Sequence, residues 1–270
     1  MPFQVLPSGT RIYYLDENQT ADQVVLLLHG LGVNSSSWLL QIPALVSIQK
    51  RVITPDTRGF GQSSYTGGSV SPKQAAEDIA ALLKILSVQR AEVVGISMGG
   101  TQALQLALDY PALVQKLVLI NTFAALRPNQ AGIWFYFLLR LFLVHFVGLE
   151  KQAELVTKRM FPNPKHETLR QELYRQILQA NPAAYRSAIR NLGRFDVRKR
   201  LAEITCPTLI VTSERDTTVP PENQRQLIRG IRDAQQVSIS DAGHAVTGEQ
   251  PEIINSYLQQ FLAGDQLPGS

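Results

Sequence analysis

The sequence of 270 residues contains a single cysteine, Cys206, and this scarcity excludes two common kinds of structure. One cysteine cannot form a disulfide bond within the chain, and metal sites built from several cysteines are excluded as well. Cys206 lies just before the apolar run Thr208–Val211, where a cysteine is typical of a small buried side chain. No other pattern of metal ligands stands out, so we expect neither a metal ion nor a cofactor.

An excess of charge of one sign is also missing. Lysine and arginine number 26 against 22 aspartate and glutamate residues, which leaves a net charge of +4. This mild excess is far from the dense basic loading of nucleic-acid-binding proteins, so we expect no nucleic-acid partner. There is no phosphate-binding loop either, because Gly59-Phe60-Gly61 fits the glycine pattern poorly and leads into a polar segment instead of a helix.

Long hydrophobic runs are nearly absent. The first residues carry neither the basic segment nor the apolar segment of a secretory signal, so we expect a cytoplasmic protein. Only Ala131–Leu149 approaches the length of a membrane span, and Arg140 near its middle would be costly in a bilayer. We therefore expect a buried or half-buried helix and no stable membrane insertion, with contact at a membrane surface as the weaker alternative.

The chain is rich in strand-like segments, several of them almost continuously apolar, as is typical of strands covered on both faces. The predicted strands are Arg11–Leu15, Val24–His29, Arg51–Pro55, Ala91–Gly95, Leu117–Ile120, Thr208–Val211 and Gln236–Ser240. A polar stretch, residues 16–22, separates the first two strands and predicts a hairpin between them.

Helical segments alternate with these strands and carry recognisable end signals. The capping residues Ser71–Gln74 precede a helix at Ala75–Leu86, and further helices are predicted from Pro221 to Gly230 and from Pro251 to Gly264. Such alternation predicts an α/β fold whose parallel, doubly wound sheet is covered by helices on both faces. The alternation stops between residues 122 and 200, which carry helical periodicity only. We therefore predict a core formed by residues 1–121 and 201–270, with residues 122–200 as a helical cap.

The most informative stretch is Gly95-Ile96-Ser97-Met98-Gly99, which lies between a predicted strand and a predicted helix. A serine in a tight strand-to-helix turn needs neighbours without a Cβ, because the strand and the helix approach each other closely. The hydroxyl then lies at the start of a helix, where unpaired N–H groups favour negative charge. This pattern predicts that Ser97 is a nucleophile.

A serine nucleophile needs a base, and the base needs a carboxylate that orients it. His244 follows the last predicted strand, at the edge where such sheets carry their reactive groups. Asp216 follows the strand before it and gives the order serine, acid, histidine that is expected for such a site. Glu214 is the alternative acid, whereas Asp241 is expected to cap its loop.

The oxyanion of the reaction intermediate needs two hydrogen-bond donors. One should be the backbone N–H of Met98, directly after the nucleophile. The second should come from the loop after His29, where Gly30 and Gly32 let the chain bend close to the site, and we assign it to Leu31 N–H.

Five motifs in this order resemble those of the α/β-hydrolase superfamily, in particular its small capped serine esterases, lactonases and C–C hydrolases. They are His29–Gly32, Asp56–Ser63, Gly95–Gly100, Asp216 and Ala242–His244. The resemblance extends from about Arg11 to Leu262 and implies a mostly parallel, eight-stranded sheet. It also implies that Asp56 and Arg58 order a loop, and that dehalogenation and epoxide opening, which use aspartate as nucleophile, are disfavoured.

The expected function is a serine carboxylester hydrolase for small to medium, largely apolar esters. The alternatives that use the same three residues, Ser97, Asp216 and His244, are lactone hydrolysis, C–C bond hydrolysis and acyl transfer or perhydrolysis. An alternative from another class is a small-molecule receptor of the same fold. Gly30, Phe123 and Trp134 are expected to contact the substrate. A small-molecule ester is the expected ligand, and the chain is expected to be a monomer or a homodimer.

Overall fold

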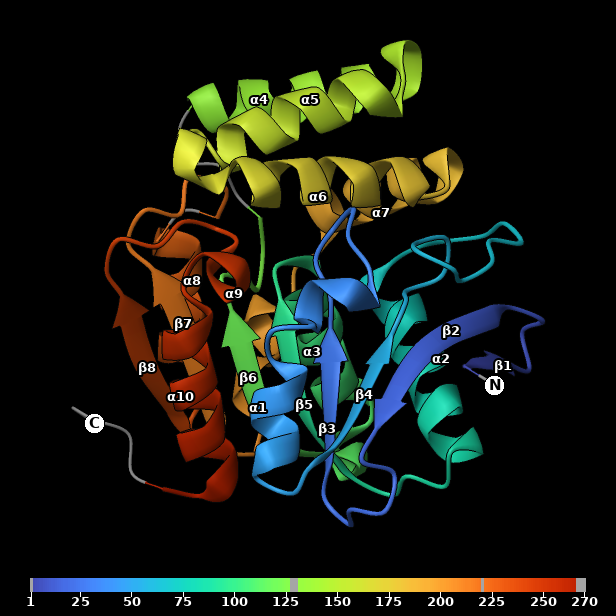
Figure 1. Cartoon of the computed structure of the whole chain (residues 1–270), viewed down its shortest axis with the longest axis vertical. Coiled ribbons are helices and arrows are strands. Elements are labelled where there is room, and N and C mark those ends of the chain that lie inside the picture. Colours follow the sequence, from blue (N-terminus) through green and yellow to red (C-terminus); the bar gives the residue numbers. More distant parts are fainter. Residues whose placement is uncertain (1, 127–130, 220, 266–270) are drawn as a thin grey trace.

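A β-sheet runs through the centre of the molecule (Figure 1). The computed structural model describes residues 2–126, 131–219 and 221–265, and the side chains of residues 131–134, 137 and 221 fall outside this description. Within these ranges eight strands form one sheet, in the order β1-β2-β4-β3-β5-β6-β7-β8. They are β1 (Phe3–Val5), β2 (Arg11–Glu17), β3 (Val24–Leu28), β4 (Arg51–Pro55), β5 (Ala91–Ile96), β6 (Val114–Ile120), β7 (Thr208–Ser213) and β8 (Ala234–Ile239).

The direction of the strands confirms the predicted fold class. All pairs among β3 to β8 are parallel, whereas β2 runs antiparallel to both β1 and β4. The prediction of a hairpin between the first two strands is wrong, because β2 pairs with β4 and β3 lies between β4 and β5. Every residue of β3 is buried, and such a strand belongs in the interior of a parallel sheet.

Helices cover both faces of the sheet, and the hydrophobic core therefore consists of two clusters, one on each face. One face carries α1 (Ile42–Ser47) and α10 (Pro251–Ala263), and the other carries α2 (Pro72–Ile85), α3 (Met98–Asp109) and α8 (Pro221–Gly230). The shorter helical segments are Ser35–Trp38, Pro111–Leu113, Pro164–His166, Arg198–Glu203 and α9 (Val246–Glu249).

Two of the predicted helix ends have the expected local cause. The Ser71 Oγ accepts a hydrogen bond from the Gln74 backbone N–H at 3.1 Å, so α2 starts at Pro72 with a side-chain cap. The Gln74 side chain does not close the reciprocal half of the capping box, since it donates to Glu77 instead. α10 ends before Gly264, whose φ of 94° is the left-handed conformation that glycine adopts without strain.

Four helices follow one another between β6 and β7: α4 (Ala131–Phe142), α5 (Leu149–Met160), α6 (Glu167–Gln179) and α7 (Pro182–Arg194). Figure 1 shows them stacked over the carboxyl ends of the strands, with α4 and α5 farther from the sheet than α6 and α7. Ala125 and Asp196 pair in an isolated antiparallel bridge near the two ends of this insertion. The division into a core and a cap at residues 122–200 stays a prediction.

The apolar run Ala131–Leu149 does not form one continuous helix. α4 passes into a π-helical turn at Leu143–Val147, which Gly148 ends with a φ of 124°. Among its described side chains, Val144 is buried, whereas Phe135 and Phe146 are 69% and 78% exposed. No helix within the described ranges is long and apolar enough to cross a bilayer.

Candidate active site

Ser97 lies between the last residue of β5 and the first residue of α3, in a conformation that few residues other than glycine adopt. Its φ of 54° and ψ of −115° place it outside the regions allowed for ordinary L-residues, and such strain persists only where neighbours hold it. The Ser97 N–H donates to the Ile120 carbonyl at 3.0 Å, and the Thr122 hydroxyl donates to the Ser97 carbonyl at 2.7 Å. β6 and the residues after it therefore hold the turn.

The glycines around Ser97 are required by close approach of the backbone. A Cβ on Gly95 would lie 2.4 Å from the Gly99 carbonyl oxygen, and a Cβ on Gly99 would lie 2.0 Å from the Leu28 carbonyl oxygen. Both contacts are far below van der Waals distance, and their partners are rigid backbone. Strand, turn and helix can therefore pack together only when these positions carry no side chain.

The structure brings the predicted base and acid together. The His244 Nδ1 lies 2.8 Å from the Asp216 Oδ2, and both side chains are buried. The other carboxylate oxygen of Asp216 accepts from the backbone N–H groups of Thr218 and Val219 at 2.7 and 2.9 Å. Asp216 is thereby fixed by its own loop and holds one nitrogen of the imidazole, which leaves Nε2 facing away from the acid.

The competing carboxylates point elsewhere. Glu214 is exposed, and Asp241 forms an exposed ion pair with Arg215. Asp241 lies in the turn after β8 with a positive φ of 58°, and its expected role as a cap of this loop stays a prediction. Among the three acidic residues weighed from the sequence, only Asp216 contacts His244.

Two residues that the sequence analysis did not assign hold the histidine loop in place. The Asn121 amide donates to the carbonyls of Gly243 and His244 at 3.2 and 3.0 Å, and its oxygen accepts from the Ser213 N–H at 3.0 Å. The Glu249 carboxylate accepts from Gly243 N–H at 2.9 Å. Asn121, like Ser97, has a positive φ, and this unusual backbone conformation cannot be seen in the sequence.

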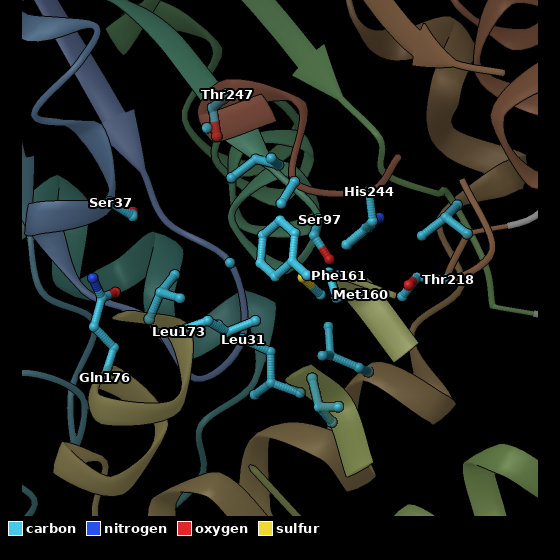
Figure 2. Close-up of a pocket in the computed structure, with 18 of the residues that line it drawn as sticks. Leu31, Ser37, Ser97, Met160, Phe161, Leu173, Gln176, Thr218, His244 and Thr247 are labelled. Carbon is cyan, nitrogen blue, oxygen red and sulfur yellow. The ribbon is translucent and has the colours of Figure 1, made fainter. Parts of the chain in front are cut away.

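Ser97 and His244 line the same cavity, of about 240 Å³ (Figure 2). Figure 2 shows both side chains reaching into this space, with Met160, the last residue of α5, and Phe161, the next residue, beside them. Within the described residues, no hydrogen bond of 3.5 Å or less joins the Ser97 hydroxyl to the imidazole. Such contacts often tighten only when substrate is bound.

The two predicted oxyanion donors lie at this cavity or next to it. Leu31 and Gly30 line the cavity, and Met98 begins α3, so that its N–H has no acceptor within the helix. In the described part of the chain the Leu31 N–H donates no hydrogen bond. Both donors are thus free to receive an anionic oxygen.

The His29 ring positions this loop, a role that the sequence analysis did not foresee. Its Nε2 accepts from the Thr57 N–H at 2.9 Å, so its Nδ1 carries the proton and donates to the Gly30 carbonyl at 2.8 Å. Burial lowers the pKa of His29, against the opposing effects of Asp56 and of the Gly30 carbonyl, and keeps the ring neutral. The ring of His29 therefore holds the Gly30 loop and the Thr57 backbone together.

The residues expected to order the neighbouring loop make the corresponding contacts. The Asp56 carboxylate accepts from the N–H groups of Ser35 and Gln62 at 2.7 and 2.8 Å. Arg58 forms a buried two-point ion pair with Asp78 at 2.5 Å. Asp56 and Arg58 therefore act on loop structure, and neither of them lines the cavity.

The expected substrate contacts are placed in part. Gly30 and Phe123 line the cavity, and Phe123 packs edge-on against Phe195. The side chain of Trp134 lies outside the described residues. The other cavity residues are mostly apolar and come largely from the helical segment between β6 and β7; they include Leu126, Val156, Met160, Phe161, Leu173, Ile189 and Leu192.

Known proteins resemble this chain over almost its whole length. The model of the α/β hydrolase fold family matches residues 23–251. A putative carbamate hydrolase RutD from Variovorax paradoxus is 30% identical over 264 residues, which are 96% of this chain and 98% of the relative. The 3-oxoadipate enol-lactonase 1 of Acinetobacter baylyi is 30% identical over 245 residues, 90% of this chain and 89% of the relative.

The fold has close counterparts among solved structures. An enol-lactonase from Burkholderia xenovorans LB400 superposes with a TM-score of 0.88 and 25% sequence identity, over 97% of this chain and all of the other. The fold, the tight strand-turn-helix at Ser97 (the elbow) and the sequence matches all indicate the same family. The chain therefore belongs to the α/β hydrolase fold family, within its group of esterases and lactonases, and is a hydrolase.

Proposed function

We propose that the protein is a serine carboxylester hydrolase that acts on small to medium, largely apolar esters through an acyl-enzyme. The observation that carries this proposal is the 2.8 Å contact between Asp216 and His244 next to the strained elbow at Ser97. A hydroxyl and an imidazole at one cavity, with a buried carboxylate behind the imidazole, are the parts that acyl transfer through serine requires.

In this mechanism the Ser97 hydroxyl attacks the ester carbonyl while the His244 Nε2 takes its proton. Asp216 keeps the proton of the imidazole on Nδ1 and stabilises the imidazolium that forms. The backbone N–H groups of Leu31 and Met98 donate to the oxyanion, each contributing a factor of roughly 10²–10³ in turnover. His244 then returns the proton to the leaving alcohol, and water releases the acid by the same steps in reverse order.

The cavity supports a small substrate. Its volume of about 240 Å³ is below the range of roughly 300–1,000 Å³ that drug-sized ligands occupy. Apolar cap residues form most of its wall, which favours an aliphatic acyl chain and excludes water from the reacting carbonyl. We propose that residues 122–200 act as the cap that forms this roof.

A lactone is the second candidate substrate. The relative from Acinetobacter baylyi and the solved structure from Burkholderia xenovorans both carry the name enol-lactonase. A lactone is a cyclic ester, so the same nucleophile, base and oxyanion donors would open it.

A chain-length series of p-nitrophenyl esters tests the proposal, with Ser97→Ala as the control. We expect rapid release of p-nitrophenol from short esters by the natural protein and essentially none by Ser97→Ala. Because the hydroxyl contributes little to packing, Ser97→Ala should unfold at the same temperature as the natural protein. Esterase activity of Ser97→Ala above a few per cent would refute the proposal.

A further inference from the structure

The apolar cavity contains one cation, Arg140, that forms no ion pair with any residue the structure describes. Arg140 of α4 lines the cavity, although its neighbours there are mostly aliphatic and aromatic. Its Nε is buried and has no hydrogen-bond partner. Within the described ranges, no carboxylate lies within 4.0 Å of the Arg140 guanidinium. A guanidinium that is half-buried in an apolar wall and lacks a carboxylate partner is costly, so its presence needs a reason.

The guanidinium is held in place by uncharged groups. The Arg140 Nη2 donates to the Tyr185 hydroxyl at 3.0 Å, and its Cζ lies 5.7 Å from the centre of the Tyr136 ring. Tyr185 is fully buried and packs against Phe60, with ring centres 6.2 Å apart. These contacts fix the position of Arg140 without neutralising its charge, since a tyrosine hydroxyl and a ring face are weak acceptors compared with a carboxylate.

Tyr185 also places this cation close to the reacting centre. A Cβ on Gly32 would lie 3.1 Å from the Tyr185 Cε2, so the tyrosine ring packs directly on the loop that carries Leu31. Because Arg140 is hydrogen-bonded to Tyr185, its guanidinium lies near the loop that carries Leu31, and both residues line the same cavity. An acyl chain that extends into the cap from a substrate carbonyl at the Leu31 N–H would approach the guanidinium.

The other charged groups around the cavity do not compensate Arg140. Glu172 also lines the cavity, but its carboxylate accepts from Gln176 at 2.9 Å and pairs with Arg175 at 2.8 Å. A second guanidinium, that of Arg159, lies 4.2 Å from the centre of the Tyr136 ring and adds positive charge beside it. The cap side of the cavity therefore favours an anion.

We propose that Arg140 binds a second, non-reacting carboxylate at the far end of an otherwise apolar acyl chain, so that among largely apolar esters and lactones those with such a terminal carboxylate are preferred. This inference rests on the proposed esterase function and adds the chemistry that selects the substrate. A guanidinium presents several N–H donors in a plane and matches the two oxygens of a carboxylate. The substrate would thereby complete the ion pair that the protein leaves open.

Two esters that differ only at the end of the acyl chain test this proposal: mono-4-nitrophenyl glutarate, which ends in a carboxylate, and 4-nitrophenyl pentanoate, which ends in a methyl group. We expect the natural protein to have a kcat/KM at least 10-fold higher for the glutarate ester. Arg140→Met should lower kcat/KM for this ester by about 100-fold, mainly through KM, since a hydrogen-bonded charge pair is lost. The pentanoate ester should change by less than about threefold, and Arg140→Lys should recover part of the loss.

Arg190→Met is the matched control, because it removes an exposed arginine from the same cap. Arg190 lies on α7 and contacts only the His145 ring among the described side chains. We expect this variant to keep the preference for the glutarate ester. Equal losses for both esters in Arg140→Met would assign Arg140 a purely structural role and overturn the proposal, and so would an equal loss of preference in Arg190→Met.

Failure of the esterase function can be told apart from failure of this inference. If the natural protein hydrolyses the pentanoate ester but does not prefer the glutarate ester, only the role of Arg140 is refuted. If it hydrolyses neither, the esterase proposal is refuted, and calorimetry with glutarate then decides about Arg140. Binding of glutarate that Arg140→Met weakens 10-fold or more supports the anion site, whereas equal binding by both proteins overturns it.

Discussion

Replacement of Asp216 by asparagine tests the geometry of the site most directly. In the structure, one oxygen of Asp216 accepts from the N–H groups of Thr218 and Val219, and the other accepts from the His244 Nδ1. An asparagine would keep the first pair of hydrogen bonds with its carbonyl oxygen. Its NH₂ group would then face the His244 Nδ1 as a donor, and the proton of the ring would move to Nε2. In that tautomer His244 cannot accept the proton of Ser97.

The substitution Asp216→Asn therefore impairs His244 as a base and leaves the fold intact. We expect kcat of Asp216→Asn on a p-nitrophenyl ester to fall by up to about 10⁴, which corresponds to roughly 5 kcal/mol in the barrier. KM should change little, since Asp216 does not line the cavity. Thermal unfolding should stay within a few degrees of the natural protein, because the loop keeps its backbone hydrogen bonds.

Glu214→Gln is the matched control, since Glu214 is an exposed carboxylate two residues away. It should keep its activity within about threefold. Retention of more than a tenth of the activity by Asp216→Asn, with normal folding, would show that the contact with His244 does not support the base. A large loss in Glu214→Gln would assign the acid to that residue instead.

Two further predictions concern stability. Gly99→Ala should lower the unfolding free energy by about 3 kcal/mol and the melting temperature by roughly 6–12 °C, because its Cβ would lie 2.0 Å from the Leu28 carbonyl oxygen. Gly30→Ala is the control, with 3.8 Å of clearance, and should melt within about 2 °C of the natural protein. Burial lowers the pKa of His29, so the unfolded chain binds a proton more readily below pH 6.5 and stability falls as the pH drops. Calorimetric melts between pH 7 and pH 5 should show a smaller decrease for His29→Gln than for the natural protein or for His166→Gln; equal decreases would contradict this account.

Local patterns in the sequence were sufficient for those parts of the protein that are built from neighbouring residues. The strand-turn-helix at Ser97 follows from its flanking glycines, and the start of α2 follows from Ser71 and Pro72. The alternation of apolar strands and helices predicted a sheet whose strands run mostly parallel. It did not predict which strands pair, because β2 lies next to β4 and not next to β3.

What the sequence by itself determined is thus the fold class, the elbow and the order of the candidate site residues, since each of these depends on spacing along the chain. Only the tertiary structure decided which carboxylate meets His244, because Asp216 and Glu214 lie two residues apart and the loop turns Asp216 towards the histidine and Glu214 towards solvent. It also decided the role of the His29 ring and the position of Arg140 in the cavity. Both features depend on contacts between residues that are far apart in the chain. The sequence does not reveal such contacts, because burial and electrostatic interactions depend on distance in space.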